Sequence, residues 1–199
     1  MVDNALECPL RSQVDSIDED RMLIAAARRD TVAAGRLFDR YYREVLGYIY
    51  HCTFDGAVAE DLTSNVFLAV FRHLGRYQWR RSSFRAWLFR IATNEVRMHW
   101  RRQKRVKIVS LQPDDEEHIA GPSAGDTMAS AEEHHLLHKA LLELRLKYRT
   151  LIILRCFEGK TIAEICEITA TKEGTVKCQL HRGLARLQDI LMSWGLLPE

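Results

Sequence analysis

The sequence lacks the features that mark membrane and secreted proteins. It contains no apolar run of 18 residues, the length that a helix needs to cross a bilayer. Residues 1–20 carry acids and no apolar core, so they do not form a secretory signal peptide. The five cysteines are scattered and include no C-x-x-C pair, which indicates free thiols and no disulfide framework. We therefore expect a cytoplasmic chain without membrane insertion.

The motifs of common catalytic sites are also absent. There is no glycine-rich phosphate loop, no nucleophile elbow and no H-E-x-x-H motif. The acids of the segment 114–117 are consecutive and lack the fixed spacing that acid–base catalysis needs. His134 and His138 lie one helical turn apart without a third ligand nearby, so a solvated helix surface explains them better than a metal site. We expect no enzyme, no cofactor and no metal, with redox sensing or metal binding by cysteines as the minor alternative.

The charges that are present are distributed unevenly, although the formal net charge is only +2. Residues 71–105 contain 11 Arg and Lys and one acid, whereas residues 106–140 contain two bases and seven acids. Arginine pairs with phosphate oxygens through a rigid planar fork. This concentration of arginine favours a nucleic-acid partner, and a solvated helix face is the alternative.

Apolar residues recur at helical spacing along most of the chain, and no segment shows the alternation of a β-strand. The ranges expected to be helical are 18–34, 35–52, 57–74, 84–105, 131–146, 149–157, 161–168 and 172–194. Proline, glycine and clustered acids in residues 106–130 are typical of a linker. The predicted fold class is all-α, with two small helical domains joined by a flexible acidic linker. The expected boundaries are a tail at 1–17, a first domain at 18–105, the linker at 106–130 and a second domain at 131–194.

The predicted helix 84–105 has an apolar side and a cationic side. Phe84, Trp87, Leu88, Ile91 and Met98 gather on one side and are expected to be buried. The opposite side carries the stripe Arg90, Asn94, Arg97 and Arg101, with Trp100 beside it. Just upstream, Tyr77 and Trp79 alternate with Arg76, Arg80 and Arg81. Aromatic rings among cations can stack on unpaired bases, so the segment indicates binding to melted DNA. The alternative places the three aromatic rings in the core and the arginines in solvent.

Residues 161–187 have the pattern of a helix-turn-helix. A short apolar helix and a tight turn at residues 169–171 precede a longer helix. Val176, Leu180, Leu184, Leu187 and Leu191 form its apolar stripe. Thr175, Cys178, His181, Arg182 and Arg186 point broadly the other way, flanked by Lys177 and Gln179. A recognition helix needs such an apolar back and polar donors toward the DNA groove.

Three blocks of this sequence carry a resemblance to a known family. They are Ala59–Tyr77 (AEDLTSNVFLAVFRHLGRY), Ser83–Arg105 (SFRAWLFRIATNEVRMHWRRQKR) and Phe157–Leu187 (FEGKTIAEICEI…EGTVKCQLHRGLARL). In order and spacing they resemble the extracytoplasmic-function (ECF) class of bacterial sigma factors. The resemblance implies a region 2-like helical bundle, a region 4-like helix-turn-helix, and a role in promoter recognition, DNA melting and transcription initiation.

The resemblance also implies partners for particular residues. The residues implied to contact the clamp helices of the largest subunit of RNA polymerase are Asp61, Ser64, Asn65, Leu68 and Arg72. The polymerase flap is a second implied contact, and the acidic linker would lie toward the RNA exit path. An anti-sigma factor is a further expected partner.

The implied DNA contacts fall in two groups. The loop 76–83, with Arg76, Tyr77, Trp79, Arg80 and Arg81, would capture a flipped base of the minus-ten element. Arg90, Asn94, Arg97, Trp100 and Arg101 would touch the melting strand and its backbone. The minus-thirty-five element would be read by Lys177, Gln179 and Arg182. Phosphates would be contacted by Lys172 and Thr175. The recognition face also includes Cys178, His181 and Arg186. A stand-alone DNA-binding regulator, or a polymerase-binding protein that does not read DNA, are the alternatives.

Overall fold

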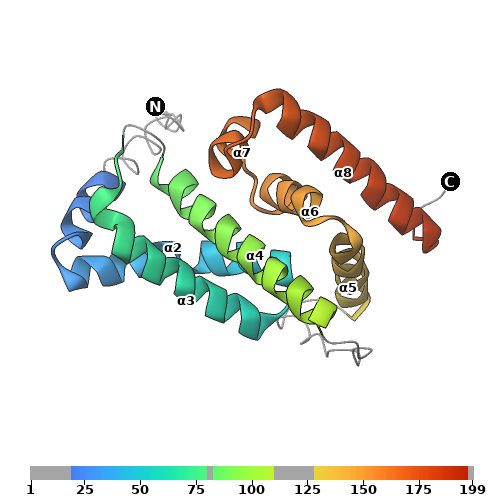
Figure 1. The fold of residues 1–199 in the computed structure, drawn as a ribbon, viewed down its shortest axis with the longest axis horizontal. Coiled ribbons are helices and arrows are strands. Elements are labelled where there is room, and N and C mark those ends of the chain that lie inside the picture. The colour runs from blue at the N-terminus through green and yellow to red at the C-terminus, as the bar shows by residue number, and fades with distance from the viewer. Residues whose placement is uncertain (1–18, 80–82, 110–127, 197–199) are drawn as a thin grey trace, which may run out of the picture.

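The computed structural model describes residues 19–79, 83–109 and 128–196, and all regular structure in these ranges is helical (Figure 1). A first helix covers residues 19–27. The following elements are α2 (Thr31–Thr53), α3 (Gly56–His73), the 3₁₀ turn η1 (Leu74–Arg76), α4 (Phe84–Val109), α5 (Met128–Glu143), α6 (Leu146–Ile152), the π-helical turn η2 (Ile153–Phe157), α7 (Ile162–Thr169) and α8 (Glu173–Ser193). The predicted all-α fold class is confirmed.

Short polar side chains determine where the first long helices begin. The carboxylate of Asp30 accepts hydrogen bonds from the backbone N–H groups of Val32 and Ala33 at 3.1 Å, and Asp55 accepts from Val58 at 2.9 Å. The predicted break at Gly35 is therefore wrong: the chain turns at residues 28–29, and α2 runs through Gly35 without interruption. A cap that satisfies two free N–H groups outweighs the weak tendency of a glycine to interrupt a helix.

The N-terminal unit, α2 to α4, packs around an aromatic core. Tyr41 and Tyr48 of α2 are 1% and 0% exposed, as the helical spacing predicts. Their rings contact Phe84 and Phe89 of α4 with centroids 5.2 Å apart in each pair. The Tyr48 hydroxyl is 2.9 Å from the Thr93 hydroxyl, which satisfies both buried polar groups.

The C-terminal unit, α5 to α8, contains the expected helix-turn-helix. Thr161 and Glu164 form a reciprocal capping box at the start of α7, which ends at Ala170 in the left-handed conformation (φ 52°). Helix α8 crosses α6 at Gly183, where an added Cβ would lie 3.1 Å from the Cβ of Tyr148. A side chain at this position would be in tight contact, so the close crossing favours glycine, which the sequence pattern did not reveal.

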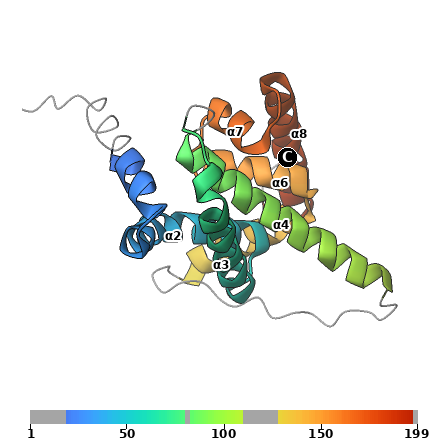
Figure 2. The same ribbon diagram turned by 60° about the vertical axis from the view of Figure 1, so that its left-hand side comes forward.

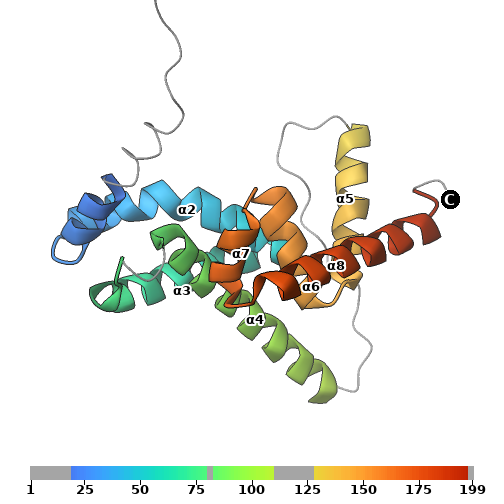
Figure 3. The ribbon, with the colours of Figure 1, turned by 90° about the horizontal axis from the view of Figure 1, so that it is seen from above.

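The two units pack directly against each other. Helix α4 lies between α3 and α7 (Figure 2), and one apolar cluster includes Leu88 and Phe89 of α4 together with Ile165 and Ile168 of α7. The turn η2 of the C-terminal unit also contacts α2. Seen from above, α5 projects away from the body (Figure 3). Helix α4 extends to Val109 and α5 begins at Met128, so helical structure enters both ends of the segment predicted as linker. The tail 1–17 and most of that linker lie outside the described residues.

This packing corrects two predicted core positions. Met98 is 43% exposed and Leu184 is 42% exposed, although both were assigned to apolar stripes. Helix α4 instead buries Phe89, Ala92 and Val96, because it is covered from two sides and not from one. In α8 the small Gly183 lies on the buried side in place of Leu184.

Within the described ranges, no helix is both long enough and apolar enough to span a bilayer.

Candidate nucleic-acid and polymerase interfaces

The second half of α4 presents a cationic surface. Asn94, Arg97 and Arg101 lie on one side at spacings of three and four residues, and all three are exposed. Arg102, Lys104 and Arg105 extend the surface toward the end of the helix and are exposed as well. Because no acid among the described residues pairs with Arg97 or Arg101, their guanidinium groups are available to phosphate.

Arg90, at the start of the predicted stripe, is already engaged. Its Nε donates a hydrogen bond to the backbone carbonyl oxygen of Glu167 on α7 at 3.1 Å, and its Nη2 donates to the same atom. This carbonyl lies near the C-terminal end of α7, where the helix dipole favours a cation. Arg90 therefore contributes to the contact between the two units in this arrangement.

The aromatic residues that flank the stripe point largely inward. Tyr77 is 6% exposed and contacts Trp87, and burial raises the pKa of its phenol to about 12. Tyr77 thus differs from the expectation of a stacking surface, because its ring is part of the core. Trp79 is half-buried against the Tyr77 edge, with the Arg21 guanidinium 5.7 Å from its ring centroid. Arg76 is exposed, whereas Arg80 and Arg81 lie outside the described residues.

Trp100 is half-buried between the two units. The guanidinium carbon of Arg149, on α6, lies 4.4 Å from the Trp100 ring centroid, a cation–π contact. The Trp100 Nε1 is buried without a hydrogen-bond partner among the described residues. One side of its ring is therefore covered by α6 in this arrangement, and the rest of the residue lines the space beside the cationic stripe.

Helix α8 has the polarity that a recognition helix requires. Val176 is fully buried and Leu187 is 8% exposed, which holds the helix on α6 and α7. The outward side is exposed at Lys172, Thr175, Lys177, Cys178, His181, Arg182 and Arg186, whereas Gln179 is half-buried.

Two of these outward residues have neighbours that set their orientation. Lys177 Nζ lies 2.6 Å from Glu173 Oε1 across one helical turn, and Arg186 lies 5.1 Å from the Tyr148 ring centroid. Arg182 forms no such contact with the described residues. The structure thus places seven of the eight predicted residues on α8 and the eighth, Lys172, at its N-cap.

Helix α3 carries the predicted polymerase-docking residues on one outward face. Asp61, Ser64, Asn65, Leu68 and Arg72 are all exposed, as their spacing of three, four and seven residues implies. Leu68 is 61% exposed and the neighbouring Phe71 is 37% exposed. The sequence pattern did not single out Phe71, which adds exposed apolar area to this face. An apolar centre within a polar rim is the pattern of a protein–protein contact.

Comparison with known proteins places both halves of the chain in one family. Residues 37–106 match the family model for Sigma-70 region 2, and residues 134–187 match that for Sigma-70 region 4. The chain is 30% identical over 185 residues to the ECF RNA polymerase sigma factor BldN of Streptomyces coelicolor, covering 91% of this chain and 69% of that protein. It is 32% identical over 155 residues to the RNA polymerase sigma factor CarQ of Myxococcus xanthus, covering 78% and 87%.

A solved structure has the same fold. It is that of the sigma factor RpoE in complex with the anti-sigma factor NepR from Bartonella quintana, with a TM-score of 0.65, 23% identity, and coverage of 79% of this chain and 96% of that one. The chain belongs to the ECF class of the sigma-70 family of RNA polymerase sigma factors. Proteins of this family are transcription initiation factors: they bind RNA polymerase and promoter DNA and direct initiation to specific promoters.

Proposed function

We propose that this sigma factor divides its work between three surfaces. The α3 face, with Leu68 at its centre, docks on the clamp helices of the polymerase. The α4 stripe from Asn94 to Arg101 holds the melted minus-ten strand, and the outward side of α8 around Arg182 reads the minus-thirty-five element. The observation that carries this proposal is the exposure of all three surfaces on separate helices of one chain. We further propose residues 18–105 and 131–194 as the domains that carry them.

The mechanism is binding without bond-making. The polymerase carries out the chemistry, and this protein lowers the free energy of the melted state by holding unpaired bases and their phosphates. The chain is therefore not an enzyme, and it works in the cytoplasm where the polymerase and the chromosome are.

The arrangement of the two units must change on promoter DNA. Elements named for positions −10 and −35 are roughly 25 base pairs apart, or ~85 Å of B-form duplex at about 3.4 Å per base pair. A 21-residue helix such as α8 is only about 32 Å long at 1.5 Å per residue. In the closed arrangement α4 packs on α7, and Arg90 donates a hydrogen bond to it. The proposed minus-ten and minus-thirty-five surfaces are then too close together to contact both elements at once. We propose that binding to polymerase separates the units.

The α3 face could also bind an inhibitory partner protein. The RpoE structure that shares this fold is a complex with an anti-sigma factor. The exposed Leu68 and Phe71 offer an apolar anchor that a competitor of the polymerase could cover. We expect such a partner to bind this chain as well.

The test of the proposed function is run-off transcription with purified bacterial core polymerase on a pool of upstream DNA fragments, with and without this protein. Discrete transcripts that require the protein would establish initiation and identify the promoter. Core binding without any transcript would favour a polymerase-binding protein that does not read DNA. A failure to bind core polymerase would overturn the assignment of the α3 face.

A further inference from the structure

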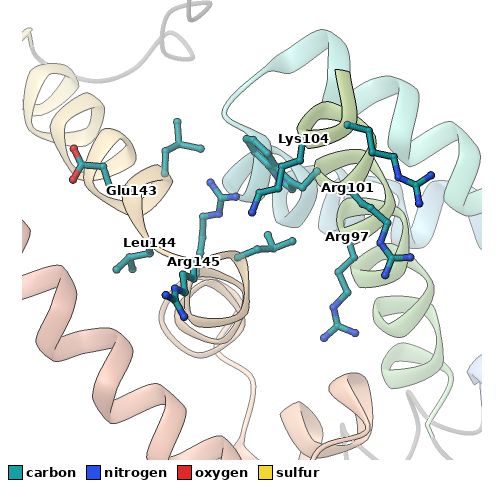
Figure 4. A pocket seen from close by; sticks show the side chains of 11 residues that line it. Arg97, Arg101, Lys104, Glu143, Leu144 and Arg145 are labelled. Carbon is teal, nitrogen blue, oxygen red and sulfur yellow. The ribbon is translucent and has the colours of Figure 1, made fainter. Parts of the chain in front are cut away.

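A cavity of about 570 Å³ lies between the C-terminal half of α4 and the junction of α5 with α6. Figure 4 shows Arg97, Arg101 and Lys104 extending from α4 on one side, with Arg145 across the space on the α5–α6 junction. Both units therefore contribute walls, and the cavity exists only while they are packed together. Its volume is within the range of small-molecule sites.

The lining of this cavity is strongly cationic. The cations are Arg97, Arg101, Lys104, Arg105, Arg145 and Arg149. Glu143 is the one acid in the lining, and it is exposed to solvent. No ion pair to a described residue neutralises any of the six. A concave site with this excess of one charge attracts and concentrates small ions of the opposite sign.

Arg149 gives the cavity a buried donor without a partner. Its side chain lines the cavity, yet the residue is only 3% exposed. Nε and Nη1 have no hydrogen-bond acceptor among the described residues. Burial lowers the pKa of this guanidinium to about 10, so the group is still a cation at neutral pH. A buried cation without a counter-ion is costly, and an anion in the cavity would offset that cost.

We propose that this cavity binds a small polyphosphate anion, either an inorganic oligophosphate or a nucleoside polyphosphate. Several arginines around one space match several phosphate groups, each of which can accept paired hydrogen bonds from a guanidinium. Trp100, Leu142 and Leu146 line the same space and offer apolar area for a base. Duplex DNA does not fit, because the most buried cation lies between two packed units.

A bound polyphosphate stabilises the closed arrangement, since its charges are shared by both units. It also occupies Arg97 and Arg101, which the proposed function assigns to DNA. This consequence rests on the proposed function, whereas the binding site itself does not.

Isothermal titration calorimetry on the full chain, without polymerase or DNA, tests the site. The probes are sodium triphosphate and ATP, both without Mg²⁺, with sulfate at equal ionic strength as the control. We expect submillimolar binding of triphosphate and no comparable binding of sulfate. Tighter binding of ATP than of triphosphate would identify a nucleotide, and equal binding would identify the phosphate chain alone.

Two variants place the binding in this cavity. Arg149→Met removes the buried cation and should weaken binding at least tenfold. Arg145→Ala changes an exposed residue at the rim, does not threaten folding, and should weaken binding severalfold. Arg43→Ala removes one exposed charge from α2, outside the cavity, and should bind as the unmodified chain does.

Thermal unfolding provides a second readout of the same site. Triphosphate should raise Tm for the unmodified chain and for Arg43→Ala, and should raise it much less for Arg145→Ala. Equal binding by Arg145→Ala and Arg43→Ala, or an equal response to sulfate, would overturn the proposal. Either result would leave the run-off experiment, and with it the proposed function, untouched.

Discussion

His138 shows how burial can hold a histidine neutral in this fold. Its ring stacks on Phe54 with centroids 4.0 Å apart, which joins α5 to the end of α2. Burial, and then the positive charges that His51, His134 and His135 can carry, lower the pKa of His138 to about 4. Protonation of this ring would place a cation against an apolar neighbour, so the folded protein resists it.

Acid should therefore destabilise the protein through this residue. Between pH of about 6.5 and about 4 the unfolded chain binds a proton that the folded protein does not, so the free energy of unfolding falls as the pH drops through this window. We expect a loss of about 1–2 kcal/mol, because the ring is half-buried and solvent screens part of the effect. Chemical denaturation across this pH range measures it.

The control is a pair of substitutions. His138→Phe preserves the stacking and removes the proton site, so it should flatten the pH dependence in this window. His73→Gln, at an exposed position of α3, should leave the dependence as it is. Equal slopes for the two variants would show that His138 is not the group responsible.

Substitution of Arg182 should change the sequence preference of DNA binding, whereas substitution of Arg97 should change its salt dependence. Arg182→Ala should weaken binding to the promoter by about 1–3 kcal/mol and relax the preference within the minus-thirty-five element, because a base contact is lost. Arg97→Ala should weaken binding to all sequences similarly and lower the salt slope by about 1, because a phosphate contact is lost. Binding of holoenzyme to matched and mismatched promoters at several salt concentrations measures both. An unchanged sequence preference for Arg182→Ala would remove it from the recognition set.

At the scale of the element, the turn of the helix-turn-helix contains local strain. Ala170 has φ 52° and ψ 41°, and its N–H donates to the Cys166 carbonyl to end α7. The left-handed conformation costs an alanine about 1 kcal/mol, which the packing of α7 on α8 offsets.

Ala170→Gly should therefore stabilise the protein. We expect the free energy of unfolding to rise by about 0.5–1 kcal/mol, measured by urea denaturation. The matched control is Ala163→Gly, an exposed position inside α7, which should destabilise by about 0.5–1 kcal/mol. A loss of stability in both variants would mean that the turn is not strained.

At the scale of the whole molecule, Lys160 joins the two units. It lies in the loop before α7 and is 5% exposed. Its Nζ is 2.6 Å from Glu44 Oε1 on α2 and 4.2 Å from the centroid of the Phe89 ring on α4. Glu44 also pairs with Arg85 at 3.3 Å. One side chain of the C-terminal unit thus contacts two helices of the N-terminal unit.

Lys160→Ala should weaken the closed arrangement by about 2 kcal/mol. The loss is smaller than for a fully buried ion pair, because Glu44 is partly exposed and still pairs with Arg85 after the substitution. Small-angle scattering of the free protein should show a larger radius of gyration. Transcription should be unchanged or raised, because the units separate on the promoter. Lys177→Ala removes the same charge from an exposed pair within α8 and should leave the radius unchanged. An unaltered radius for Lys160→Ala would mean that the apolar contacts alone hold the units.

Sequence periodicity predicted most of the helices and two of their outward faces. The α3 face and the polar side of α8 follow from local spacing, because a helix places residues three and four apart on one side whatever surrounds it. The resemblance to sigma factors rested on the same local blocks. The start of α2 was misplaced because several weak signals compete over a few residues, and the cap at Asp30 prevailed.

Only the tertiary structure decided how the two units meet. The contacts of Arg90 with α7, of Trp100 with Arg149, and of Lys160 with Glu44 join residues far apart in the chain. Met98 and Leu184 were predicted as buried because periodicity reveals that a helix has an apolar side but not which neighbours cover it. The cationic cavity has the same origin, since neither unit forms it alone. Contacts of this kind depend on shape and packing between distant segments, which local spacing does not encode.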